Sequence, residues 1–138
     1  MLELVTARAT RWGLLAVAIG AIGIAARSGC TDIRQRWIPF AIHGTSMQPA
    51  LETGQFVLVD TARGPRAGDI VVARRPDRPE LEVVKRVSTI GADSTLYLLG
   101  DNAAQSTDSR QFGAVSAEDI VGVVRWRYWP PWQAKRIG

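Results

Sequence analysis

The sequence predicts a mainly β protein: a small antiparallel sheet, folded over or closed into a barrel, behind a hydrophobic N-terminal helix. From residue 37 onward, short runs rich in Val, Ile and Leu recur at about ten-residue spacing, a pattern typical of small β folds. Gly, Pro, Asp and Ser fill the segments between the runs, where their backbone preferences favour turns. We therefore expect an N-terminal segment over residues 1–36 and a β domain over residues 37–138.

The apolar runs predict the strands in chain order. β-branched residues are frequent in each run, as expected of strands. We expect Trp126 and Tyr128 in the last run to close the core, and Trp129 and Trp132 to contact a membrane interface. The expected strands are "FVLVD" (56–60), "DIVVAR" (69–74), "LEVVKRV" (81–87), "TLYLL" (95–99) and "DIVGVVRWRYW" (119–129).

The N-terminal segment contains "WGLLAVAIGAIGIAA", residues 12–26, which has 15 residues without a charge between Arg11 and Arg27. As a helix it would be about 22 Å long, shorter than a hydrocarbon core of about 30 Å. Three interpretations stay open: a short or tilted membrane anchor, a helix lying on the membrane or on the domain, and a cleaved secretory signal. The arginines on either side slightly favour a cytoplasmic domain by the positive-inside rule.

Composition excludes several kinds of site. The net charge of +4 comes from scattered basic residues, so it does not predict a nucleic-acid partner. Cys30 is the only cysteine and His43 the only histidine, which excludes an intramolecular disulfide and a multi-histidine metal site. We therefore expect neither a metal nor another cofactor.

One expected strand carries a lysine where its pattern predicts burial. In the run 81–87, Lys85 alternates onto the same face as Leu81, Val83 and Val87. A charged ammonium on a core face is costly, and burial lowers the pKa of a lysine. The simpler alternative is an edge strand whose lysine reaches out to solvent. Arg86, on the opposite face, is expected to be an ordinary solvated charge.

The stretch "HGTSMQPALETG" (43–54) places a serine in a turn. Gly and Pro alone would explain such a turn. As a nucleophile, Ser46 needs a base within hydrogen-bond reach, and His43 would have to fold back from the same short segment. A neutral lysine amine can serve instead. Lys85 is the candidate, because the other lysine, Lys135, lies in a charged tail.

Three stretches resemble the sequence boxes of the signal peptidase I family. "GTSMQPALETG" is similar to the nucleophile box, and "GDIVVARRPDRPELEVVKRV" to the box ending in the general-base lysine and an arginine. "GDNAAQSTDSRQFGAV" is similar to the third box. They occur in family order between residues 43 and 115. The resemblance implies a signal-peptidase-like folded sheet and a hydrolase of the signal peptidase I type, a serine endopeptidase without a cofactor.

The same resemblance assigns catalytic roles. It makes Ser46 the nucleophile, with its backbone N–H as one oxyanion donor, and Lys85 the general base. Ser106 matches the serine that orients the lysine amine. Asp108 and Arg110 match a supporting ion pair.

It also assigns roles around this dyad. Residues 100–102 match the turn that brings the third box beside the dyad, and Met47 would pack near the substrate groove. Gly44 stands where bacterial members carry an oxyanion-donating serine, so a second donor must come from Thr45 or elsewhere.

The expected function is removal of N-terminal leader peptides from precursor proteins at a membrane. The partner is a secretory preprotein or the precursor of nickel superoxide dismutase, since "RRPDRPELEVVKRV" and "RYWPP" resemble the peptidases that mature that enzyme. A dismutase-maturing enzyme would act at the cytoplasmic face. Two alternatives stay open: a self-cleaving serine–lysine peptidase like the SOS repressors, and a non-catalytic β binding module held at the membrane.

Overall fold

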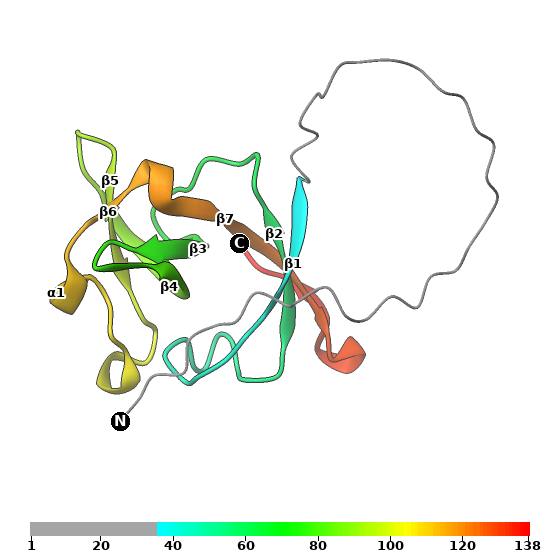
Figure 1. The fold of residues 1–138 in the computed structure, drawn as a ribbon. Helices are drawn as coiled ribbons and strands as arrows, with labels where there is room; N and C mark the ends of the chain where they lie inside the picture. Colours follow the sequence, from blue (N-terminus) through cyan, green and yellow to red (C-terminus); the bar gives the residue numbers. More distant parts are fainter. Residues whose placement is uncertain (1–35) are drawn as a thin grey trace, which may run out of the picture.

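The computed structural model describes residues 36–138, which form an eight-stranded antiparallel sheet (Figure 1). The expected hydrophobic helix therefore lies outside the described residues, and the division at residue 36 stays a prediction. Within residues 36–138 no helix is long and apolar enough to cross a membrane. The strands are β1 (Trp37–Ala41), β2 (Phe56–Asp60), β3 (Ile70–Arg75), β4 (Arg78–Ile90), β5 (Thr95–Leu99), β6 (Val115–Ser116), β7 (Ile120–Trp129) and β8 (Lys135–Arg136).

The helical elements of the described part are short and lie between strands. They are η1 (Ala103–Gln105), α1 (Ser109–Phe112), η2 (Ala117–Asp119) and η3 (Pro131–Gln133). In the sheet the order is β1-β2-β7-β3-β4-β5-β6, and β8 pairs with β7. The prediction of a mainly β, antiparallel fold is confirmed.

The expected strands match the sheet closely, with instructive differences. β2 and β5 coincide with the predicted runs, whereas β4 extends to 13 residues because it pairs with both β3 and β5. β1 was not predicted. Its sequence "WIPFA" carries Pro39, which weakens a strand pattern and is tolerated at a sheet edge. β6 and β8 have two residues each, too short to show an alternation.

The sheet encloses two apolar clusters, one on each face of its central strands. The first includes Phe40, Val57 and Ile70, and the second includes Val71 and Leu98. In β3 the first four residues are all buried because alternate side chains enter opposite clusters. The central strands are therefore buried on both sides, which gives the sheet a rigid middle.

The end of β7 differs from the prediction that its aromatic side chains are buried. Trp126 and Tyr128 do not close the core: they are 46% and 40% exposed. Arg125 and Arg127 take the buried alternate positions instead. Arg127 is accommodated because its Nε donates to the carbonyl of Gln133 at 2.8 Å. We call the exposed aromatic side chains at the end of β7 and in η3 the aromatic face: Trp126, Tyr128, Trp129 and Trp132. Trp37 is also exposed but lies at the other end of β2, where it pairs with Asp60.

Candidate active site

The turn that carries Ser46 is an extension of β1. Ile42 continues the pairing beyond the strand, since its N–H donates to the Gln55 carbonyl at 2.8 Å. Gly44 then has a φ of +84°, a left-handed conformation that favours glycine. After the turn the Leu51 N–H donates to the Met47 carbonyl at 2.9 Å. The turn is thus held at both ends, while Ser46 itself stays half-buried.

Met47 and Leu51 anchor this turn to the body of the protein. They are 3% and 0% exposed and belong to the first core cluster. The expected contact of Met47 with a substrate groove stays a prediction, and its burial shows an anchoring role. His43 is exposed.

Lys85 lies in the interior of the sheet. Its strand is bordered by β3 and β5, and Lys85 is 2% exposed, so the edge-strand alternative is wrong. On the β3 side it pairs with Val71. On the other side its neighbour Arg86 pairs with Leu99, the last residue of β5 before Gly100. Residues directly opposite one another share a face of the sheet.

Gly100 marks the point where distant segments meet. A Cβ on Gly100 would overlap the Ser106 side chain and would lie 2.7 Å from the Ser46 carbonyl oxygen. Ser46 and Ser106 thus meet at Gly100, one residue beyond the Leu99 that pairs with Arg86. The absent side chain leaves room for the convergence of these three segments.

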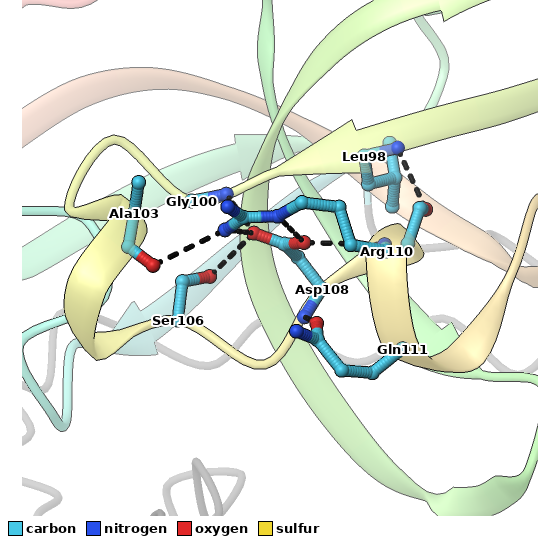
Figure 2. A network of polar contacts seen from close by, with 8 residues as sticks. Leu98, Gly100, Ala103, Ser106, Asp108, Arg110 and Gln111 are labelled. Carbon is cyan, nitrogen blue, oxygen red and sulfur yellow. Dashed lines mark hydrogen bonds and ion pairs between the residues drawn. The ribbon is translucent and has the colours of Figure 1, made fainter.

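The carboxylate loop, residues 100–112, is organised around Asp108 (Figure 2). Asp108 is 0% exposed. Its Oδ2 accepts hydrogen bonds from Ser106 Oγ at 2.8 Å, Gly100 N–H at 3.0 Å and Arg110 Nη2 at 2.8 Å. Its Oδ1 accepts from Arg110 Nε at 2.8 Å. Asp108 also caps α1, where its backbone N–H donates to Gln111 Oε1 at 2.9 Å.

These donors determine the charge of the Asp108 carboxyl. Burial by itself would raise its pKa, because the charged form loses water. The hydrogen bonds from Arg110, the Gly100 N–H and Ser106 outweigh that effect and hold the pKa well below its usual range. The group is therefore an anion at physiological pH.

An ionised Asp108 fixes the role that Ser106 can play. The Ser106 hydroxyl has one proton, which it donates to Asp108, so only its lone pairs remain for another partner. Ser106 is thus an acceptor beside Gly100, at the end of β5. An amine that donates an N–H to Ser106 would keep its nitrogen lone pair free to accept a proton from another group.

Arg86 is not an ordinary solvated charge. It donates to both oxygens of Asp101, from Nε at 2.7 Å and Nη2 at 2.6 Å, and from Nη1 to the Gly68 carbonyl at 2.8 Å. Bidentate pairs of this kind fix orientation as well as distance. The residue after Lys85 thus ties β4 to the carboxylate loop, which the sequence alone did not indicate.

Asn102 belongs to the turn, residues 100–102, that the resemblance expected beside the dyad, but its individual hydrogen bonds were not predicted. Its backbone N–H donates to the Ser46 carbonyl at 2.9 Å, and its Nδ2 donates to the Thr45 carbonyl at 3.2 Å. The signal was present in the Gly-Asp-Asn turn, but the partner lies 57 positions away. The carboxylate loop and the Ser46 turn are therefore in direct contact.

Comparison with known proteins identifies the family. The profile described as "Signal peptidase, peptidase S26" matches residues 10–95 and 90–129. The chain belongs to the signal peptidase family. Among residues 36–138, no group of three or more His, Cys, Asp or Glu side chains is placed so that it could bind a metal ion.

Its relatives come from mitochondria and bacteria. The chain is 36% identical to mitochondrial inner membrane protease subunit 1 of Schizosaccharomyces pombe, over 63% of this chain and 70% of that protein. Human mitochondrial inner membrane protease subunit 1 is 29% identical over 63% and 66% of the two chains. Signal peptidase I of Bacillus caldolyticus is 29% identical over 66% and 79%.

Proposed function

We propose that this protein is a serine endopeptidase that removes N-terminal leader peptides from precursor proteins, with Ser46 as nucleophile and Lys85 as general base. The observation that carries the proposal is the meeting of the Ser46 turn, the Lys85 strand and Ser106 around Gly100. Membership of the signal peptidase family supports the reaction class. A binding module would gain nothing from a lysine that is 2% exposed beside a serine turn.

The chemistry follows from the surroundings of each group. Burial disfavours a charged ammonium, so the Lys85 amine is kept neutral and able to take the Ser46 proton. The Ser46 oxygen then attacks the scissile carbonyl, and the developing oxyanion is stabilised by the Ser46 N–H and by the Thr45 side-chain hydroxyl. The protonated amine gives its proton to the leaving amino group. Water then hydrolyses the acyl-enzyme, with Lys85 again as base.

Ser106, Asp108 and Arg110 act in support. Arg110 and Ser106 keep Asp108 ionised, and Asp108 keeps the Ser106 proton. The Ser106 lone pairs then accept from the Lys85 amine, which leaves the nitrogen lone pair directed at Ser46. The three residues are positioning residues, since none of them exchanges a proton with the substrate.

The dyad is tested by removing each partner in the purified full-length protein. Ser46→Ala and Lys85→Ala should each lower cleavage of a leader peptide by at least about ten-thousand-fold while circular dichroism stays unchanged. Lys135→Ala, which removes the other lysine, is the matched control and should keep full activity. Cleavage retained by either dyad variant would contradict the assignment. Because only the neutral amine accepts the proton, the wild-type rate should rise with pH.

The substrate is tested with two precursors. The resemblance of "RRPDRPELEVVKRV" and "RYWPP" to the dismutase-maturing peptidases makes the nickel superoxide dismutase precursor a candidate substrate beside a secretory preprotein. Each precursor is incubated with the enzyme, and the new N-termini are mapped. Cleavage of the dismutase precursor at its leader junction would make the enzyme a dismutase-maturing peptidase. Cleavage of the preprotein alone would make the enzyme a general leader peptidase, and cleavage only of its own chain would favour the SOS-repressor-like alternative.

We place the enzyme at a membrane surface. The four aromatic side chains of the aromatic face are between 40% and 80% exposed, and the exposed Arg136 pairs with Trp126 in the sheet. Aromatic and basic side chains gather at the interface of bilayers. In a variant with both Trp12→Phe and Trp37→Phe, the remaining tryptophans all belong to the aromatic face. Their fluorescence should be quenched by brominated-lipid vesicles carrying the protein, and unquenched emission would contradict this placement.

A further inference from the structure

We propose that Asn102 is a positioning residue for the oxyanion donor: it holds the peptide unit between Thr45 and Ser46 so that the Ser46 N–H points at the developing charge. This inference rests on the proposed function, because it assumes that Ser46 is the nucleophile. It gives Asn102 a role of its own within the turn formed by residues 100–102.

The geometry depends on one planar group. The carbonyl of Thr45 and the N–H of Ser46 belong to the same peptide unit, in which the two bonds point in opposite directions. Asn102 Nδ2 donates to that carbonyl at 3.2 Å, and the Gln48 N–H donates to it at 3.1 Å. Two donors on the oxygen leave the plane little freedom to rotate. The direction of the Ser46 N–H is therefore fixed from the opposite side of the group.

The next peptide unit is held as well. The Asn102 backbone N–H donates to the Ser46 carbonyl at 2.9 Å, so Asn102 holds the peptide units on both sides of the nucleophile. Donors at a carbonyl also polarise the peptide and strengthen the hydrogen bond that its N–H gives. A donor aimed before the reaction begins stabilises the oxyanion without a cost of reorganisation.

Asn102 is itself held firmly. Its neighbour Asp101 is fixed by both oxygens to Arg86, and the Gly100 N–H donates to Asp108. Arg86 follows Lys85 directly in β4. The segment 100–102 therefore connects the strand of the base with the turn of the nucleophile, and Asn102 is the end of that connection.

Steady-state kinetics test the role with a matched control. Asn102→Ala removes the side-chain donor and should lower kcat about ten-fold, less than the loss of an oxyanion donor itself, with KM within about two-fold. Asn102→Asp has the same shape, but its carboxylate cannot donate to the Thr45 carbonyl and opposes the oxyanion, so the loss should be larger. The control Thr53→Val removes the hydrogen bond from Thr53 Oγ1 to the Gly44 carbonyl, 2.8 Å. It loosens the same turn one peptide unit earlier and should leave kcat within about two-fold.

A transition-state analogue separates positioning from simple support of the fold. A leader-derived peptide boronate forms a tetrahedral anion on Ser46, so its affinity should fall in Asn102→Ala by the same factor as kcat. The affinity for an intact leader peptide should be the same in the Ser46→Ala variant and in the Ser46→Ala/Asn102→Ala double variant. Unchanged boronate affinity, or equal losses in Asn102→Ala and Thr53→Val, would overturn the role of Asn102. A wild-type enzyme that cleaves no leader would instead overturn the proposed function.

Discussion

The carboxylate loop and the aromatic face manage their chemically awkward groups in opposite ways. The loop buries an anion, Asp108, and surrounds it with donors from its own segment: Gly100, Ser106 and Arg110. The face leaves large rings in solvent, with Trp132 80% exposed. A buried charge without partners is costly, so every group around Asp108 must keep its place. An exposed ring has no such requirement, and its position is free to serve contact with something outside the chain.

Removal of the buried anion should have the largest effect of the substitutions that test this contrast. Asp108→Ala leaves the Gly100 N–H and the Ser106 hydroxyl without their acceptor and removes the cap of α1. We expect a loss of about 3 kcal/mol in the free energy of unfolding, measured by urea denaturation, together with loss of activity. Asp77→Ala, which breaks the exposed pair with Arg75, is the control and should leave the transition midpoint near that of the wild type. Equal losses of stability in Asp108→Ala and Asp77→Ala would show that the buried carboxylate is no more important than an exposed one.

The next largest effect is expected at Gly100. An added methyl group would overlap Ser106 and approach the Ser46 carbonyl oxygen to 2.7 Å, so Gly100→Ala must push the three segments apart. Displacement of catalytic groups by about 1 Å costs about a hundred-fold in rate. We expect that loss in leader cleavage, with a smaller loss of about 1–3 kcal/mol in stability.

The control for this substitution is Gly64→Ala. No atom lies within 4 Å of its added methyl group, so both activity and stability should be retained. Full activity in Gly100→Ala would show that the three segments tolerate separation.

Acid should lower the free energy of unfolding through protonation of Asp108. The variant Asp108→Asn, which cannot be protonated there, separates this contribution from that of other groups. The folded-state pKa of Asp108 is lowered, despite its burial, by Arg110, Gly100 and Ser106. The unfolded chain therefore binds its proton first, and the stabilisation is complete above the unfolded pKa of about 3.9. It is lost as the pH falls toward the folded pKa. Wild-type stability should drop from about pH 5 to pH 2, and the drop should be smaller in Asp108→Asn. Parallel curves would show that Asp108 is not the group responsible.

The sequence predicted the sheet better than the connections between its segments. The strands β2 and β5 follow from β-branched runs between turn residues, and Lys85 follows from strand alternation. The bond from Arg86 to Asp101 could not be predicted, since it depends on the register of β4 against β5. The same holds for Asn102, whose partners lie in another turn. Trp126 and Tyr128 were misplaced because alternation fixes which residues share a face but not which face is buried.

The smallest effect is expected on the aromatic face. Trp132 is 80% exposed and contacts the Trp129 ring at a centroid distance of 6.4 Å. Trp132→Ser should change the free energy of unfolding by no more than about 0.5 kcal/mol. Leu98→Ala, in the second core cluster, is the matched contrast: Leu98 is 0% exposed, and its truncation should cost about 2–5 kcal/mol. Both are measured by urea denaturation in the absence of lipid. A large loss in Trp132→Ser would mean that the ring belongs to the folded core, and its exposure could then no longer support a membrane-facing surface.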